Sequence, residues 1–134
     1  NLGQWLPTAI RESPEVVEIF GETFRHLEGL QIKLAKLFQL DDEDVPFTVK
    51  KEITSAMRRI APIGLATTIG WSANPRTLRW TLEMRTHPTA EEEIRLVFGK
   101  IGEIVCARYP HLFGDFEVAT EKGLPWYKPK NSKV

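Results

Sequence analysis

The 134-residue chain lacks a net charge, because 18 Lys and Arg residues balance 18 Asp and Glu residues. No overall electrostatic field therefore draws it to nucleic acid or to an acidic membrane surface, and any anion site must be local. A single cysteine, Cys106, excludes an internal disulfide and a cysteine-based zinc site, which favours the reducing cytoplasm. No apolar run approaches the length needed to span a bilayer. We expect neither nucleic acid nor membrane among the partners of this chain.

Several motifs of common chemistries are also missing. The sequence contains no phosphate-binding loop, no dinucleotide-binding glycine motif and no Gly-x-Ser-x-Gly nucleophile motif. The histidines, His26, His87 and His111, are too widely spaced for a metal pattern. The acidic stretch 41–46 lacks the glycine and the distal glutamate of an EF-hand, which favours a solvated loop over a calcium site. These features predict no metal site and identify no catalytic residue.

Apolar periodicity predicts a mainly helical protein, and the length suits a single domain. Ser13 and Pro14 have the form of an N-cap followed by proline at the first helical position. Apolar residues then recur every three or four positions, which predicts a long amphipathic helix over 14–39. Further helices are expected before Pro62, from Pro75 to Arg85 behind an Asn74 cap, from Thr89 to about Tyr109 and, more weakly, over 111–122.

One segment has the alternation of a strand. Residues 63–73 alternate a mostly bulky face with a face of Gly, Ala, Thr and Ser. The small face would admit either a closely packed helix or a flat ligand. The tail 124–134 carries prolines and lysines without periodicity and is expected to be flexible. The predicted fold is a single, predominantly helical α+β domain over residues 1–134.

Three arginines follow the predicted strand within one helix. Arg85 continues the stripe of Leu78 and Leu82, so it must either pair with a nearby glutamate or hold an anion. Arg76 lies in the first helical turn, where a cation is mildly unfavourable and backbone N–H groups can receive a phosphate or a carbonyl. The pattern therefore leaves open both helix-end salt bridges and a local anion site.

Cys106 is the one candidate thiol nucleophile in the sequence. A thiol needs a neighbouring base or a lowered pKa to act in this way. Cys106 lies beside the apolar stripe of a predicted helix and belongs to no local motif. We expect a structural thiol.

Four motifs follow one another at a distinctive spacing. They are "RRIAP" with Arg58, Asn-Pro-Arg at 74–76, the helix ending in Arg85, and the Glu-Ile-Arg at the end of Ala90–Arg95. This order resembles the C-terminal half of the flavin-dependent thymidylate synthases, most closely over residues 55–98.

The resemblance implies a role for five residues. Arg58 and Arg85 would bind the substrate dUMP. Asn74, Arg76 and Met84 would bind the cofactor FAD. The implied reaction is the reductive methylation of dUMP to dTMP, with methylenetetrahydrofolate as carbon donor and NADPH as electron donor. The resemblance also implies a homo-oligomer, a tetramer in the family, and a chemistry that needs no cysteine nucleophile.

The sequence departs from the family pattern in several places. Trp80 replaces an Asn or His near the flavin, and Thr89 replaces a His. Arg79 matches no family ligand and is expected to be neutral for dUMP affinity. The upstream Arg-His-Arg signature is not found, so we expect the C-terminal portion of such an enzyme, inactive alone. The alternative is a non-catalytic helical oligomerisation or scaffold module derived from that family.

Overall fold

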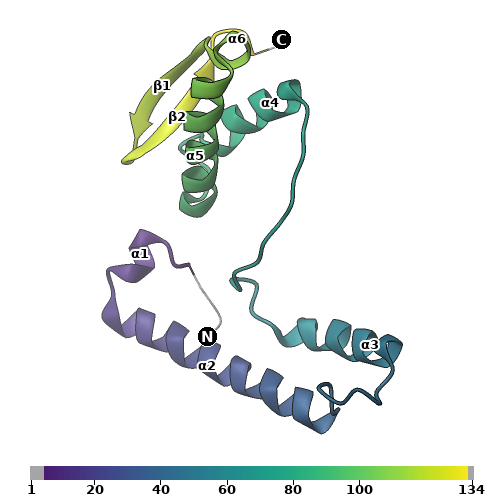
Figure 1. The fold of residues 1–134 in the computed structure, drawn as a ribbon. Helices are drawn as coiled ribbons and strands as arrows, with labels where there is room; N and C mark the ends of the chain where they lie inside the picture. The colour runs from purple at the N-terminus through teal and green to yellow at the C-terminus, as the bar shows by residue number, and fades with distance from the viewer. Residues whose placement is uncertain (1–4, 133–134) are drawn as a thin grey trace. The chain divides into compact units, whose positions relative to one another are not determined.

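The computed structural model describes residues 5–132, which form helices and a two-stranded antiparallel sheet (Figure 1). This confirms the predominantly helical α+β class. The chain divides into two compact units, Asn1–Thr68 and Ile69–Val134, where the sequence analysis expects one domain. Among the described residues, no helix has the length and apolar character to cross a bilayer.

The regular elements in the described part of the first unit are all helical. Its elements are α1 (Thr8–Arg11), α2 (Pro14–Leu37), α3 (Phe47–Met57) and the 3-10 turn η1 (Arg58–Ile60). Helix α2 begins as predicted, with Pro14 at its first position, although the Ser13 side chain makes no capping hydrogen bond. The helix ends two residues earlier than predicted. Gln39 takes a left-handed conformation with φ of 50°, which a right-handed helix does not accommodate.

Little of the first unit is shielded from solvent. None of the described residues 5–68 is buried, and Leu37 and Phe47 are 68% and 78% exposed. Helices α2 and α3 meet through a hydrogen bond of 3.0 Å from Gln31 Nε2 to the Met57 carbonyl oxygen. Between them lies an open apolar groove of about 370 Å³. Because burial of apolar surface is the main stabilising term in folding, this unit gains little from its own packing.

The predicted strand over 63–73 is wrong. Leu65 forms an isolated bridge, and residues 66–74 have no regular secondary structure. Ile69 is 79% exposed, while Trp71 packs edge-on against Phe98 with ring centroids 5.9 Å apart. Alternation favours an extended backbone, but a strand also requires a neighbouring strand to pair with its N–H and C=O groups. No such ladder forms for this segment among the described residues.

The second unit carries the sheet. Its elements are α4 (Pro75–Arg85), α5 (Glu92–Arg108), α6 (Pro110–Phe113), β1 (Phe116–Glu121) and β2 (Leu124–Pro129). Strands β1 and β2 form a hairpin in which Phe116 pairs with Pro129 and Glu121 with Leu124. Lys122 and Gly123, with φ of 51° and 74°, form its two-residue turn.

This hairpin corrects two expectations. The weak helix over 111–122 is limited to α6, because β1 occupies 116–121. The tail 124–134 is not wholly flexible, because 124–129 form β2. Helix α5 also begins at Glu92 rather than Thr89, whose hydroxyl instead lies 2.8 Å from His87 Nδ1.

The apolar core lies between α4, α5, α6 and the hairpin. Its buried members are Leu82, Val105, Phe113 and Tyr127, with Leu82 fully buried. Helix α5 approaches β2 so closely at Gly102 that a Cβ there would lie 2.6 Å from the Tyr127 ring. Glycine is therefore required where the helix crosses the strand.

Two buried polar residues join the helices to the hairpin. Thr86 Oγ1 donates to the Leu82 carbonyl oxygen at 2.7 Å and accepts from the Tyr127 amide at 2.9 Å. Arg95 is 2% exposed and donates to the carbonyl oxygens of Glu121 at 2.7 Å and Leu124 at 3.2 Å. These bonds satisfy backbone groups at the turn end of the hairpin.

Candidate functional site

Helix α4 carries most of the predicted site residues. Asn74 is its N-cap, since Asn74 Oδ1 accepts a 2.8 Å hydrogen bond from the Thr77 amide, and Pro75 occupies the first helical position. Arg76, Trp80 and Met84 follow at intervals of four residues and therefore share a face. Trp80 is 60% and Met84 50% exposed. This face combines a guanidinium with large apolar side chains open to solvent.

Arg85 is exposed, contrary to the expectation that it faces the core. The leucine stripe is continued at the end of α4 by Thr86, which is fully buried and forms the C-cap. Arg85 lies at the edge of this stripe and needs no buried counter-charge. Its guanidinium is therefore accessible to a ligand.

Arg58 belongs to the first unit. It lies in η1, is exposed, and donates from Nη2 to Ser55 Oγ at 3.0 Å. The other four predicted site residues lie in the second unit, on α4 or at its cap. The structure thus brings together Asn74, Arg76, Met84 and Arg85 on α4 or at its cap, whereas Arg58 belongs to the other unit.

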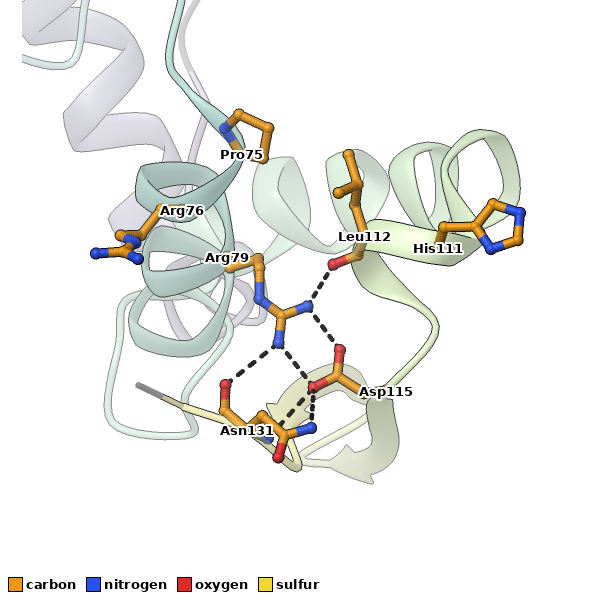
Figure 2. A pocket seen from close by; sticks show the side chains of 7 residues that line it. All are labelled: Pro75, Arg76, Arg79, His111, Leu112, Asp115 and Asn131. Atoms are coloured by element: carbon orange, nitrogen blue, oxygen red, sulfur yellow. Dashed lines mark hydrogen bonds and ion pairs between the residues drawn. The ribbon is translucent and has the colours of Figure 1, made fainter. Parts of the chain in front are cut away.

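Two hollows flank Arg79, which the sequence predicted to be neutral for dUMP affinity, and Figure 2 shows the residues that line the first of them. One, of about 370 Å³, is lined by Pro75, Arg76, Arg79, His111, Leu112, Asp115 and Asn131. The other, of about 250 Å³, is lined by Arg76, Arg79, Trp80, Glu83, Pro129, Asn131 and Ser132. Arg76 and Arg79 line both hollows.

Arg79 forms hydrogen bonds and an ion pair with other segments of the second unit. Its Nη1 and Nη2 atoms donate to the two carboxylate oxygens of Asp115 at 2.6 and 2.7 Å, forming a bidentate ion pair. Nη1 also donates to the Leu112 carbonyl oxygen, and Nη2 donates to that of Asn131 at 3.3 Å. Figure 2 shows Arg79 directed into this network, while Arg76 points away from it.

The electrostatics of the pair follow from these contacts. The hydrogen bond from Arg79 lowers the pKa of Asp115 to about 2, and the same bond raises the pKa of Arg79. The Phe116 ring centroid lies 4.9 Å from the Arg79 guanidinium carbon, which adds a cation–π contact. The charge of Arg79 is balanced by Asp115 within the fold. Arg76 lines the same two hollows and is exposed.

The sequence contained a signal for this pair. Arg79 lies one position after Leu78 and three before Leu82, which places it beside the buried stripe of α4. No local pattern identifies Asp115 as the partner of Arg79, because Asp115 is 36 residues away and its position depends on the fold.

Cys106 has the environment of a structural thiol. It packs against the core, and its Sγ lies 3.7 Å from the Phe113 carbonyl oxygen. Burial raises the pKa of the thiol, which keeps it protonated and weakly nucleophilic at neutral pH. In residues 5–132, no group of three or more His, Cys, Asp or Glu side chains is placed to hold a metal ion.

Comparison with known proteins identifies the family. A family model described as thymidylate synthase complementing protein matches residues 4–111, a range that includes Arg58 and all of α4. The chain belongs to this family. Two relatives are both named flavin-dependent thymidylate synthase: one from Mycobacteroides abscessus, 30% identical over 122 residues, and one from Corynebacterium glutamicum, 31% identical over 117 residues. Each comparison covers 86% of this chain and 47% of the relative, so the chain spans about half the length of these relatives.

Proposed function

We propose that this chain is part of a cytoplasmic flavin-dependent thymidylate synthase that methylates dUMP reductively to dTMP. Methylenetetrahydrofolate would supply the carbon and NADPH the electrons. The observation that carries the proposal is the family match over residues 4–111, which includes the capped helix α4 with its exposed arginines. When bound, FAD would supply the redox chemistry.

The exposed side chains of α4 suit a flavin nucleotide. Arg76 offers a cation beside two hollows, and the Asn74 cap uses its carbonyl oxygen, which leaves the amide NH₂ as the donor for a ligand. Met84 offers an exposed, polarizable apolar side chain that can lie against an aromatic ring. A cation, an amide donor and an apolar contact match an anionic, carbonyl-bearing aromatic ring system.

The dUMP site would be formed by Arg58 and Arg85. A guanidinium presents a planar set of donors that matches phosphate oxygens and pyrimidine carbonyls. Arg85 is accessible at the end of α4, and Arg58 is accessible in η1. Both residues would bind and orient the nucleotide. The protonated Cys106 thiol supports a route without a cysteine nucleophile.

We also propose that the protein functions as a homo-oligomer, with a tetramer as the assembly that the family resemblance implies. Residues 5–68 bury no side chain within the chain, and large apolar residues of α2 and α3 are exposed. Contact with further polypeptide would remove this surface from water and stabilise the unit.

The test uses the protein encoded by the complete reading frame. Purification should yield a yellow protein with a flavin absorbance spectrum. Incubation with dUMP, methylenetetrahydrofolate and NADPH should yield dTMP, detected by chromatography, and omission of NADPH is the control. A well-folded oligomer without flavin or turnover would instead favour the scaffold function. Trp80, an exposed aromatic where the family has Asn or His, favours that second candidate.

A further inference from the structure

Helix α4 is attached to the rest of its unit in two chemically different ways. The first attachment is apolar: Leu82 is fully buried in the core, and Leu78 packs against it. The second is polar and has two members: Arg79 within the helix, and Thr86 at its C-cap, whose Oγ1 accepts from the Tyr127 amide at 2.9 Å. Arg76 and Arg85 lie outside both attachments and are exposed.

The Arg79 attachment reaches three separate segments. Its guanidinium contacts the Leu112 carbonyl oxygen in α6, the Asp115 carboxylate just before β1, and the Asn131 carbonyl oxygen just after β2. Asp115 Oδ2 also accepts from the Asn131 backbone amide at 3.3 Å and from Asn131 Nδ2 at 3.4 Å. Figure 2 shows the Arg79 bonds converging on one guanidinium and the Asn131 donors directed at the Asp115 carboxylate. The network therefore joins α4 to both strands of the hairpin at its open end, opposite the turn.

The apolar contact does not fix the rotation of the helix about its own axis, because the hydrophobic effect is non-directional. The Thr86 bond to the Tyr127 amide restrains the C-cap, whereas Arg79 is bonded in the middle of the helix. The bidentate pair is directional and sets both the angle and the height of α4. Arg76 and Arg85 lie on opposite flanks of the buried stripe. A small rotation of α4 would therefore move one guanidinium towards the core and the other away from it.

We propose that Arg79 and Asp115 are positioning residues that fix the rotation of α4 about its axis. At this rotation, Asn74 and Arg76 can bind the flavin, and Arg85 can bind the nucleotide. This inference rests on the proposed function, since it assigns the pair a role in that same site. It replaces the expectation that Arg79 is neutral for ligand affinity.

The test compares matched variants of the protein from the complete reading frame. Asp115→Asn removes the charge of the acceptor, and Arg79→Lys keeps the cation but cannot form the fork. Two controls leave the Arg79–Asp115 pair intact. Glu117→Gln removes the exposed Lys130–Glu117 ion pair, whose atoms are 3.4 Å apart. Gly123→Ala strains the hairpin turn, where φ is +74° and the added Cβ meets open space.

Two measurements are made at a temperature where every variant is folded by circular dichroism. The first is the FAD dissociation constant, from quenching of flavin fluorescence. We expect Asp115→Asn and Arg79→Lys to raise it about tenfold to a hundredfold, as small misplacements of binding groups do. Both controls should stay within about threefold of the wild type because they keep the Arg79–Asp115 pair, even where Gly123→Ala lowers the melting temperature as much.

The second measurement is backbone hydrogen exchange, which needs no flavin. The amides of α4 should exchange faster in Asp115→Asn than in the wild type, while those of α5 stay unchanged. Equal α4 exchange in both proteins, or an equal loss of FAD affinity in Gly123→Ala, would overturn the positioning role. A wild-type protein that takes up no flavin would overturn the proposed function itself. Flavin uptake that is equal in all variants would overturn only the inference about Arg79 and Asp115.

Discussion

Arginine serves three physical purposes in this chain. Arg95 is buried and donates to carbonyl oxygens at the turn end of the hairpin. Arg79 is paired with Asp115 and joins α4 to the hairpin. Arg58, Arg76 and Arg85 are exposed. Similar chemistry therefore supports the fold at Arg79 and Arg95, whereas exposed guanidinium groups remain available for ligands.

Replacement of Arg58 or Arg85 by Ala should weaken dUMP binding about ten- to a hundredfold in the protein from the complete reading frame. The reason is the loss of a charge-assisted hydrogen bond, worth about 1.5–3 kcal/mol. Isothermal titration calorimetry measures the affinity, and circular dichroism should show unchanged helix content.

Each variant has a matched control. Arg59 is the exposed neighbour of Arg58 in η1, and Arg108 is exposed in the last turn of α5 as Arg85 is in that of α4. Arg59→Ala and Arg108→Ala should change dUMP affinity by less than about threefold. If they weaken binding as much as the test variants, the effect is general electrostatics and the assignment of Arg58 and Arg85 fails.

Cys106→Ala should leave dTMP turnover within a few fold of the wild type. The half-buried thiol is held protonated by a raised pKa, so it offers little thiolate for attack. The substitution should cost about 1 kcal/mol of unfolding free energy through lost packing. Urea denaturation and single-turnover kinetics measure the two effects. A loss of turnover above about a hundredfold in a folded variant would indicate covalent catalysis instead.

At the scale of elements, a helix or strand could be predicted from the sequence when the contacts that determine it are local in the chain. Helix α4 was predicted with its observed limits, because the Asn74 cap and Pro75 are local signals. The strand predicted over 63–73 does not form, because strand pairing requires a second segment that local alternation does not reveal. The hairpin was missed because Pro125 and Pro129 interrupt the usual strand composition, and its helical neighbours supply much of the packing.

The junction of α4 with the hairpin should weaken in acid. Asp115 has a folded-state pKa of about 2, below its ordinary value of 3.8. A depressed pKa stabilises the fold above pH 3.8, and this contribution is lost as the pH falls from about 4 towards 2. The contribution is about 1–2 kcal/mol after allowance for solvent screening, because the Asp115 side chain is 24% exposed.

The comparison with Asp115→Asn isolates this carboxylate. Urea denaturation should show the wild type more stable than Asp115→Asn at pH 7, with the difference shrinking steadily below pH 4. The Glu117→Gln variant, which loses an exposed pair, should show a smaller difference at pH 7. A stability gap between wild type and Asp115→Asn that persists at pH 2 would mean that the carboxylate charge is not the cause.

At the scale of the whole molecule, the candidate site was predicted only in part. Four of its five residues share α4 or its cap, and the fifth, Arg58, lies in the other unit. Sequence motifs proposed all five candidates through family resemblance. They could not reveal the role of Arg79, since its partner Asp115 is distant in the chain.

The 134-residue polypeptide by itself should form no dTMP. It spans about half of the relatives that it matches, and residues 5–68 bury no side chain. Purified chain is incubated with dUMP, FAD, NADPH and methylenetetrahydrofolate, and the product is measured by chromatography against a boiled control. Turnover above that control would show that the two units suffice for catalysis.

The exposed backbone of residues 66–74 has a consequence for the covalent integrity of the protein. It is the only chain connection between Arg58 and α4, and its described residues lie outside helix and sheet. Proteases cleave where backbone is accessible and not held in secondary structure. A single nick in this segment would separate the two proposed dUMP arginines onto different fragments without cutting any helix. Whether the fragments then stay together would depend entirely on non-covalent contacts.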